Sequence, residues 1–374
     1  MLTHEFPPFR GGIATYACEL AIAAQALGHK VTVVAPDFGE DLTERDRATY
    51  QFTVRRYKAG VYSRRELLPL LIRSWQWSRN NNYDVIHAID VPYVMGLSFV
   101  NRFRRAPFVA TAYGTDILSM PNSKQAKVLG VRNMFSFPSR VFTISRFTRD
   151  LLVDRCRTVS DDRVLITHLG VDARWFEPAR KTDEALVKLA IPKDHKVILT
   201  VARLDERKGH RTVLRAISQL EERLRQKLTY LIVGKGDDSS YEQELQTLAG
   251  ECGAKVIFAG GITDDDLRAL YAAADIYCMP GEPHPKKVEG FGIVYLEAAA
   301  QKLPSIASAI GAVPEVVLHE KTGLMIEPGD VKSLAEALTK LLTDEPYRRA
   351  LGEAACEYAQ TFTWKRCAEK TYGL

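Results

Sequence analysis

Two glutamates flank a glycine turn at the start of a predicted helix. The segment 286–300, KKVEGFGIVYLEAAA, places Glu289 before a Gly-Phe-Gly turn and Glu297 eight residues later. The glycines permit a tight turn and a close approach of the backbone. Residues 293–300 then read as a helix whose free N–H groups and positive dipole end attract an anion. The carboxylates would bind hydroxyl groups, and the N–H groups between them would bind phosphate.

The same segment also has a purely structural explanation, in which Glu289 caps the helix and Glu297 is solvated. At about 1.5 Å of rise per helical residue, the two carboxylates lie up to roughly 12 Å apart. That is about the reach from a sugar hydroxyl across a diphosphate to a ribose. The spacing therefore fits a nucleotide sugar, although spacing alone leaves both explanations open.

Cations and glycines follow two further predicted strands. The strand VILTVA leads into a loop that carries Arg203 and Lys208, and the strand YLIVG leads into a loop that contains Gly234 and Gly236. Two cations at the end of a strand suit a diphosphate, while solvated loop charges are the ordinary alternative. We expect the two glycines to face the nucleotide.

The amino-terminal half contributes a third group of residues. Gly11 and Gly12 precede a predicted helix over residues 13–27, where a glycine pair lets a ligand approach the helix start. Tyr113 and Asp116 follow the predicted strand PFVATA. Ligands of doubly wound sheets bind at such carboxyl ends of strands, so both side chains are candidates for the active site.

With these residues in place, the chain resembles the retaining glycosyltransferases of the GT-B fold, family 4, over nearly its full length. Residues 289–297 are similar to the Glu-x7-Glu signature of that family, including its GFG-I-x-x-x-E pattern, and residues 203–209 are similar to its donor-phosphate motif R-L-x-x-x-K-G. The resemblance implies that Glu289 binds hydroxyls of the transferred sugar and that Glu297 binds the ribose. It implies that the diphosphate is held by Arg203, Lys208 and the helix start at Phe291, Gly292 and Ile293.

The chain departs from the family pattern after the strand PFVATA. Gly11 and Gly12 are similar to the glycine loop that family members place over the donor phosphates and the acceptor, but Tyr113-Gly114 stands where members usually have His-Gly near the reacting sugar. A neutral phenol with a pKa of about 10 donates a hydrogen bond but cannot take the titrating role of a histidine. The role of Tyr113 is therefore open.

The length of 374 residues predicts two domains. Aliphatic runs alternate with amphipathic segments, which indicates parallel sheets covered on both faces. The resemblance implies an α/β GT-B fold, with two doubly wound Rossmann-like domains whose parallel sheets face a central cleft. We expect an acceptor-binding domain over residues 1–173, to which the tail 359–374 returns, and a nucleotide-sugar domain over residues 174–358.

The sequence opens almost directly in a loop, MLTHEFPPFRGG. A doubly wound half needs a strand before the helix over residues 13–27. We therefore expect the usual first strand to be all but missing, because the given sequence begins late or is truncated.

Composition and short sequence patterns limit the kinds of compartment, cofactor and partner that the chain can have. No apolar run approaches the roughly 18 residues of a membrane span, and no secretory signal pattern is present, so we expect a cytoplasmic protein. The six cysteines form no CxxC pair, which favours reduced thiols. The acidic run 264–266 is better explained by Thr263 as a helix N-cap than by a metal. We expect no metal, no cofactor beyond the nucleotide-sugar donor, and no nucleic-acid partner.

The first half is positively charged. Residues 1–175 carry 24 basic and 16 acidic residues, which makes this half the expected meeting point for an anionic acceptor or membrane. In the stretch 54–79, arginines alternate with leucines and aromatic residues such as Trp75 and Trp77. This stretch fits a segment lying on the inner face of a membrane, or a strand and a core helix with a solvated basic face. Pro69 predicts a break or a helix start.

The predicted reaction is the metal-independent transfer of a hexosyl group, with retained configuration, from a GDP- or UDP-linked sugar to a glycan, a lipid-linked acceptor or a small-molecule hydroxyl. The segment VEGFGIVYLEA resembles mannosyltransferases that use GDP-mannose. Two alternatives bind the same nucleotide sugar: a GT-B epimerase, and a non-catalytic binding subunit. The presence of Lys208 and Glu289 favours transfer over the latter.

Overall fold

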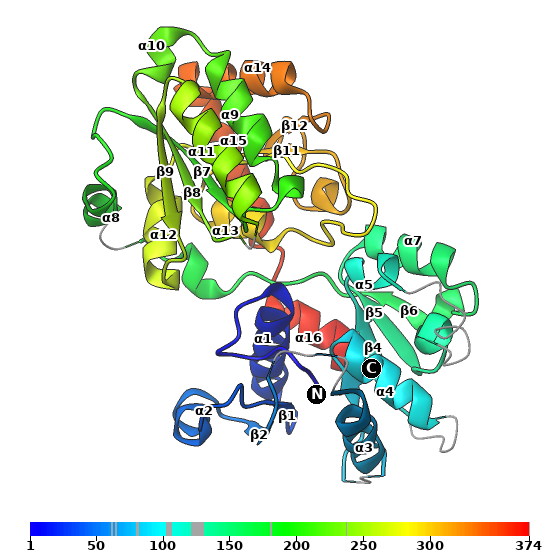
Figure 1. The fold of residues 1–374 in the computed structure, drawn as a ribbon. Helices are drawn as coiled ribbons and strands as arrows, with labels where there is room; N and C mark the ends of the chain where they lie inside the picture. Colours follow the sequence, from blue (N-terminus) through cyan, green and yellow to red (C-terminus); the bar gives the residue numbers. More distant parts are fainter. Residues whose placement is uncertain are drawn as a thin grey trace. The chain divides into compact units, whose positions relative to one another are not determined.

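The computed structural model describes residues 1–60, 63, 66–79, 82–101, 107–120, 131–179, 182–236 and 238–373. The chain forms two α/β units, Met1–Gly170 together with Thr363–Leu374, and Val171–Phe362 (Figure 1). The carboxyl-terminal segment thus belongs to the first unit. The limits expected from the sequence, 173 and 359, lie within a few residues of these boundaries.

The first unit contains parallel strands in two sets. Strand β1 (Thr32–Pro36) pairs with β2 (Thr53–Tyr57). The second set runs in sequence order: β3 (His87–Ala88), β4 (Val109–Ala112), β5 (Arg140–Thr143) and β6 (Val164–Ile166).

Leu2 joins the two sets of strands. It forms parallel bridges to Val34 of β1 on one side and to Ala88 of β3 on the other. Its backbone N–H donates to the His87 carbonyl oxygen at 2.8 Å, and the Thr3 N–H donates to the Val34 oxygen at 3.1 Å. The first strand is thus reduced to a single bridged residue, which confirms the expectation that it is all but missing, and residues 1–3 lie between β1 and β3.

The helices of the first unit connect and cover these strands. Their starts and ends follow local rules: Gly28, at φ 91°, stands just after the first helix, and the Ser145 hydroxyl accepts the Thr148 N–H at 3.0 Å and so caps α7. The helices are α1 (Gly12–Ala26), α2 (Thr43–Thr49), α3 (Leu67–Ser78), α4 (Val91–Asn101), α5 (Thr115–Leu118), α7 (Arg146–Arg155) and α16 (Trp364–Tyr372).

Helix α16 returns to pack beside α1 (Figure 1). A buried polar chain fixes it: the Tyr372 hydroxyl lies 2.6 Å from His87 Nδ1, His87 Nε2 lies 2.8 Å from Thr111 Oγ1, and Thr111 Oγ1 lies 3.0 Å from the Tyr16 hydroxyl. Burial lowers the pKa of His87 well below its usual range, so the imidazole is neutral and has one donor and one acceptor nitrogen.

The second unit is one parallel sheet with the order β12-β11-β10-β7-β8-β9. Helices α9, α11 and α14 pack together on one side, and α12, α13 and α15 pack on the other. The strands are β7 (Lys196–Val201), β8 (Leu228–Val233), β9 (Lys255–Gly260), β10 (Ile276–Met279), β11 (Ser305–Ser308) and β12 (Gly323–Ile326). The helices are α8 (Thr182–Lys188), α9 (His210–Ser218), α10 (Glu222–Arg225), α11 (Ser239–Glu251), α12 (Asp264–Ala273), α13 (Ile293–Ala300), α14 (Val331–Thr343) and α15 (Glu345–Ala359).

We predict that Tyr372→Phe destabilises the first unit. The substitution leaves His87 Nδ1 buried without its partner, which costs about 1–3 kcal/mol. Calorimetry should show a lower melting temperature, by about 2–4 °C per kcal/mol. Tyr347→Phe is the control, because the Tyr347 ring packs on Lys340 and its hydroxyl has no hydrogen bond among the described residues. Equal melting temperatures for Tyr372→Phe and the wild type would contradict this role.

Candidate functional site

The strand order of the second unit indicates the edge of its sheet at which a ligand is expected to bind. Strand β7 comes first in the chain, β8 and β9 follow on one side, and β10, β11 and β12 lie on the other. The order therefore reverses between β7 and β10, and doubly wound sheets bind ligands outside the carboxyl ends of the strands at such a point. The loops after β7 and β10 meet there, because the Glu282 N–H donates to the Arg207 oxygen at 2.8 Å.

Glycines let the loops at this edge pack closely. A Cβ atom on Gly209 would lie 2.0 Å from the Pro280 oxygen, and one on Gly234 would lie 1.9 Å from the Ala202 oxygen. A Cβ on Gly236 would approach Leu204 Cβ to 2.8 Å. Gly234 and Gly236 thus pack against the loop that carries Arg203, and their contact with a nucleotide stays a prediction.

A buried ion pair lies at the centre of the edge. Lys208 Nζ donates to Glu289 Oε2 at 2.6 Å, and Arg207 Nη1 lies 3.6 Å from the same oxygen. The side chains of Lys208, Arg207 and Glu289 are only 13%, 14% and 18% exposed. The structure therefore joins the cation expected to bind phosphate to the carboxylate expected to bind sugar hydroxyls.

Asp205 and Lys287 extend this cluster. Asp205 Oδ2 lies 3.0 Å from Lys287 Nζ and 3.5 Å from Arg207 Nε, while Asp205 Oδ1 accepts the Arg207 N–H at 3.3 Å. Three cations thus surround two carboxylates, which leaves one net positive charge for an anionic ligand. Asp205, Arg207 and Lys287 were not predicted as site residues. The one local signal was the position of Asp205 before the run Glu-Arg-Lys, which is typical of an N-cap.

The cations decide the charge of Glu289. Burial alone would raise its pKa, but Lys208 and Arg207 outweigh burial and hold the pKa below its usual value. Glu289 is therefore ionised at neutral pH and accepts hydrogen bonds only. A diphosphate entering here would compete with Glu289 for the Lys208 ammonium group.

Helix α13 starts and ends where the sequence predicts. Gly292, at φ 85°, precedes it, and a Cβ there would lie 2.7 Å from the Tyr295 ring. Ile293 is its first residue. The Phe291 ring is buried and packs on Phe362, with centroids 5.8 Å apart, so only the Phe291 backbone can serve a ligand.

A further glycine supports the backbone of Glu289. A Cβ on Gly311, at φ 54°, would lie 2.4 Å from the Glu289 oxygen, and the Ala312 N–H donates to that oxygen at 3.0 Å. The loop after β11 thus fixes the backbone of Glu289 and so positions its carboxylate.

Glu297 lies one turn into α13 in a different environment. The Tyr271 hydroxyl donates to its Oε2 at 3.3 Å, and the Trp175 ring packs edge-on against Tyr271 at 5.8 Å. Burial raises the pKa of Glu297 to about 7, with a smaller upward contribution from Asp264 that Tyr271 and Arg174 only partly offset. Near neutrality this carboxyl group is present both protonated and ionised, unlike Glu289.

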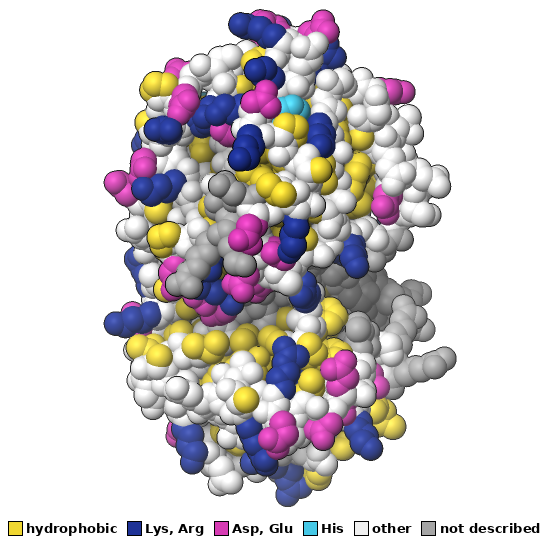
Figure 2. Space-filling view, turned by 90° about the vertical axis from the view of Figure 1, so that its left-hand side faces the viewer, with side chains coloured by type: hydrophobic (Ala, Val, Ile, Leu, Met, Phe, Trp, Pro, Cys, Tyr) yellow, Lys and Arg dark blue, Asp and Glu magenta, His cyan; other side chains and the backbone are white. Residues whose placement is uncertain are grey.

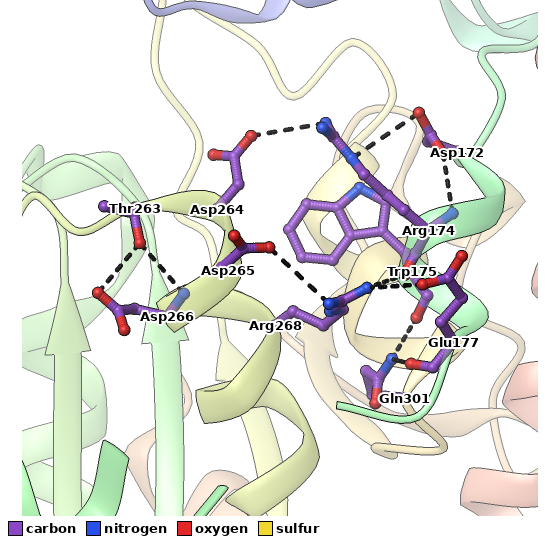
Figure 3. A network of polar contacts seen from close by, with 10 residues as sticks. All are labelled: Asp172, Arg174, Trp175, Glu177, Thr263, Asp264, Asp265, Asp266, Arg268 and Gln301. Atoms are coloured by element: carbon purple, nitrogen blue, oxygen red, sulfur yellow. Dashed lines mark hydrogen bonds and ion pairs between the residues drawn. The ribbon is translucent and has the colours of Figure 1, made fainter. Parts of the chain in front are cut away.

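Figure 3 shows a polar network between the segment that carries Arg174 and the start of α12. Arg174 lies 3.5 Å from Asp264, and Arg268 donates to the Arg174 carbonyl oxygen at 2.8 Å. Thr263 Oγ1 accepts the Asp266 N–H at 3.2 Å, which confirms the predicted N-cap. Among the described residues, no group of three or more His, Cys, Asp or Glu side chains is arranged for a metal ion.

The candidates of the first unit lie at the carboxyl edge of its own sheet. Gly11 and Gly12 stand at the start of α1. The Tyr113 hydroxyl donates to the Ile89 oxygen at 2.8 Å, and burial raises its pKa well above the usual range. The Asp116 carboxylate accepts the N–H groups of Tyr113, Gly114 and Ile117. Asp116 therefore shapes the loop, and a direct catalytic role for either side chain remains a prediction.

Two family models match successive parts of the chain. The model described as "Glycosyltransferase Family 4" matches residues 10–175. The model described as "Glycosyl transferases group 1" matches residues 181–358. The matches follow the two units of the structure.

Curated relatives match over nearly the full length. An uncharacterized glycosyltransferase of Methanocaldococcus jannaschii is 27% identical over 100% of this chain and 96% of its own. A GDP-mannose-dependent alpha-(1-6)-phosphatidylinositol monomannoside mannosyltransferase of Mycobacterium tuberculosis is 28% identical over 98% of this chain and 94% of its own. A D-inositol 3-phosphate glycosyltransferase of Corynebacterium aurimucosum is 33% identical over 61% of this chain and 54% of its own.

Solved structures share the fold. Anabaena HepE in complex with UDP and glucose matches with a TM-score of 0.79 at 20% identity, covering 100% of this chain and 97% of that chain. A glycosyltransferase of Rickettsia africae matches with a TM-score of 0.80 at 20% identity, covering 100% and 96%. These similarities establish the GT-B fold.

We predict that Glu297→Gln changes how stability depends on pH. The folded-state pKa of about 7 exceeds the ordinary 4.5, so the stabilising contribution of the neutral carboxyl is complete below about pH 4.5 and is lost as pH rises through 7. Glutamine stays neutral. The free energy of unfolding of the variant, relative to the wild type, should therefore rise between about pH 5 and pH 8, by a few kcal/mol at about 1.4 kcal/mol per pKa unit.

Urea denaturation at several pH values measures this difference. Glu251→Gln, at the exposed end of α11, is the matched control and should show no such slope. A difference between Glu297→Gln and wild type that does not change with pH would contradict the assigned environment of Glu297.

Proposed function

Because the chain belongs to the family 4 glycosyltransferases with the GT-B fold, we propose that it transfers a hexosyl group from a nucleotide diphosphate sugar with retention of configuration and without a metal ion. The observation that carries the proposal is the buried pair of Lys208 and Glu289 at the switch point of the second sheet. In this proposal, Lys208 binds the diphosphate and the adjacent Glu289 binds the sugar.

The departing diphosphate needs a cationic environment. Negative charge grows on it as the glycosidic bond breaks, and fixed charges and dipoles stabilise that charge without reorganisation. Lys208, Arg207 and Arg203 supply positive charge from the loop after β7, and the N-terminus of α13 supplies free N–H groups. In this proposal these groups take the place of a metal ion.

The two carboxylates bind different parts of the donor. Glu289, ionised by its cations, accepts hydroxyls of the hexosyl group, and Glu297 binds the ribose. The leaving phosphate takes the proton of the attacking acceptor hydroxyl on the same face of the sugar. No second carboxylate acts as a nucleophile, in contrast to retaining hydrolases.

We assign GDP-mannose as the donor and a glycolipid as the acceptor. The support is the relative from Mycobacterium tuberculosis, whose name gives GDP-mannose and a phosphatidylinositol mannoside, together with the VEGFGIVYLEA segment. A UDP-sugar is the competing donor, since Anabaena HepE is solved with UDP and glucose.

A lipid acceptor requires contact with a membrane, and helix α3 offers a surface for it. Pro69 lies in its first turn, as expected. Leu68, Ile72 and Trp75 are 66%, 49% and 45% exposed and follow one another at helical spacing, so they form an outward apolar stripe. The Arg79 guanidinium lies over the Trp75 ring at 4.7 Å.

The inner side of α3 packs as a core helix. Leu70 and Ser74 are buried, and a Cβ on Gly96 of α4 would lie 2.3 Å from Ser74 Oγ. Arg73 is held by Glu66 at 3.3 Å and lies over the Tyr57 ring. Helix α3 therefore has features of both alternatives given above for residues 54–79. One face packs in the core, and the other exposes apolar side chains.

Among the described residues, the face shown in Figure 2 has no large patch of a single charge that would mark a membrane surface. On the face shown in Figure 2, Lys and Arg side chains are interspersed with Asp and Glu side chains. None of the helices within the described ranges is long and apolar enough to cross a bilayer. We place the stripe of Leu68, Ile72 and Trp75, with Arg79, on the anionic cytoplasmic leaflet as a peripheral contact. Arg64 and Arg65, which belong to the same predicted stretch, lie outside the described residues.

Vesicle sedimentation tests the stripe. We expect binding to phosphatidylcholine vesicles that contain phosphatidylserine, weaker binding as salt rises, and loss of binding when Leu68, Ile72 and Trp75 are all replaced by Gln. Val187→Gln, which changes an exposed apolar residue of α8, is the control. Equal sedimentation with and without phosphatidylserine, or an unaffected triple variant, would rule the stripe out as an anionic membrane contact.

Transfer from labelled GDP-mannose to a phosphatidylinositol mannoside tests the reaction. We expect a product with the anomeric configuration of the donor, in the presence of a chelator. Lys208→Ala and Arg203→Ala should each lower turnover by about a hundredfold, as loss of a preorganised charge does. Lys227→Ala is the control because Lys227 pairs with Asp194 on the surface. An inverted product, or near-wild-type turnover in Lys208→Ala, would refute the mechanism.

A further inference from the structure

Helix α12 contributes a buried tyrosine that contacts the carboxylate of Glu297. The Tyr271 side chain is fully buried, and its hydroxyl donates to Glu297 Oε2 at 3.3 Å. The same hydroxyl lies 3.5 Å from the Val294 carbonyl oxygen, in the first turn of α13. Within the described ranges, Tyr271 is the one residue that donates a hydrogen bond to the Glu297 carboxylate. The bond therefore ties one carboxylate oxygen to α12 and leaves the other oxygen, Oε1, for a ligand.

Aromatic neighbours fix the direction of the Tyr271 hydroxyl. The Trp175 ring packs edge-on against the Tyr271 ring, with centroids 5.8 Å apart and an interplanar angle of 80°. The Tyr277 ring of β10 lies 6.0 Å from the Tyr271 ring, at an angle of 53°. Both neighbours are buried. Because closely packed interiors hold side chains in well-defined rotamers, the hydroxyl points steadily toward α13.

The segment that carries Trp175 is itself attached to α13. The side-chain amide of Gln301, which follows the last residue of α13, donates to the carbonyl oxygens of Trp175 and of Glu177, the latter at 3.1 Å (Figure 3). Helix α13 also packs against α12. The segment around Trp175, α12 and α13 therefore form one connected support for the side chains of Tyr271 and Glu297.

The Tyr271 hydroxyl remains a hydrogen-bond donor throughout the neutral pH range. Burial, and then the charge of Glu297, raises the pKa of Tyr271 well above its usual range. A donor bonded to a carboxyl group favours its ionised form, so Tyr271 lowers the pKa of Glu297 against the larger opposing effect of burial. Glu289 is kept ionised by two cations, whereas the group that serves Glu297 is a neutral phenol.

The other titratable and charged groups near Glu297 act differently. Asp264 at the start of α12 raises the pKa of Glu297 and Arg174 lowers it, and these two side chains lie 3.5 Å apart as an ion pair. Tyr277 is neutral as well, because burial raises its pKa well above the usual range. Of these groups, Tyr271 is the one that both bonds the carboxylate and favours its ionised form.

We propose that Tyr271 is a positioning residue for the nucleotide, whose hydroxyl orients the Glu297 carboxylate so that it accepts both hydroxyls of the ribose. An ionised carboxylate has acceptor sites for two hydroxyls, while a protonated one has fewer. The inference rests on the proposed function, in which Glu297 binds the ribose. It adds that the protein prefers a ribonucleoside diphosphate to the dideoxy analogue that lacks both hydroxyls, and that Tyr271 sets the size of this preference.

The preference for a ribose must depend on pH. Burial raises the pKa of Glu297 to about 7, and ribose hydroxyls donate to the ionised form. The ratio of the affinities for GDP and dideoxy-GDP should therefore rise as pH increases through about 7. The ratio removes the titration of the diphosphate, which both ligands share. Without the Tyr271 hydroxyl the pKa of Glu297 is higher still, so the ratio should rise only at a higher pH.

Isothermal titration calorimetry of the full-length protein with GDP and with dideoxy-GDP tests the role of Tyr271. At neutral pH, Tyr271→Phe should weaken GDP binding by about five- to tenfold and leave the affinity for dideoxy-GDP unchanged. Above about pH 8 the loss should be smaller, because Glu297 is then ionised in the variant too. Glu297→Gln should give a ratio that does not change with pH. The same comparison with UDP and dideoxy-UDP covers the competing donor.

A second buried tyrosine provides the matched control. Tyr230→Phe in β8 also removes a buried hydroxyl, one that lies 2.9 Å from Thr200 Oγ1. We expect this variant to keep the wild-type ratio of affinities and its pH dependence. Melting temperatures of Tyr230→Phe and Tyr271→Phe measure the structural cost of losing a buried hydroxyl, so that the ribose preference is judged apart from stability.

The inference is wrong if Tyr271→Phe keeps the wild-type ratio and pH dependence, or if it weakens both ligands by the same factor, since an equal loss is a purely structural effect. It is also wrong if Tyr230→Phe lowers the ratio as much as Tyr271→Phe does. A wild type that binds GDP or UDP without preferring either to its dideoxy analogue removes the ribose role of Glu297 and the inference with it. Binding of neither GDP nor UDP refutes the proposed function itself.

Discussion

The buried contact between Lys208 and Glu289 is the constraint on which the second unit depends. Removing two charges from water costs several kcal/mol per ion unless the geometry is close and further partners are present. Here the atoms are 2.6 Å apart, and Arg207 adds a second cation to the same oxygen. The glycines Gly209 and Gly311 serve this contact, because a side chain at either would push apart the backbones that bring the two loops together.

The two carboxylates at the start of α13 have opposite protonation tendencies, because Glu289 and Glu297 lie in different surroundings. Cations hold Glu289 ionised, while burial beside Tyr271 lets Glu297 take up a proton near neutrality. Opposed pKa shifts of neighbouring acids are a common sign of divided roles. The pattern agrees with one carboxylate on the reacting sugar and the other on a part of the donor that does not react.

Local signals in the sequence predicted local structure well. The helix over residues 293–300, the N-cap Thr263 and the two-unit α/β fold all follow from spacing, capping and periodicity. Contacts between distant residues were not predictable in this way. Lys208 and Glu289 are 81 residues apart, and nothing in either segment encodes their pairing. Leu2 was overlooked because a single residue with bridges on both sides has no periodicity.

The central claim is that Lys208, the cation of the Lys208–Glu289 pair, binds the donor diphosphate, and a crystal structure with a bound nucleoside diphosphate tests it most directly. The account predicts phosphate oxygens within hydrogen-bond distance of Lys208 Nζ, with the Lys208–Glu289 contact longer than its present 2.6 Å. A diphosphate bound elsewhere, with this contact unchanged, would contradict the account.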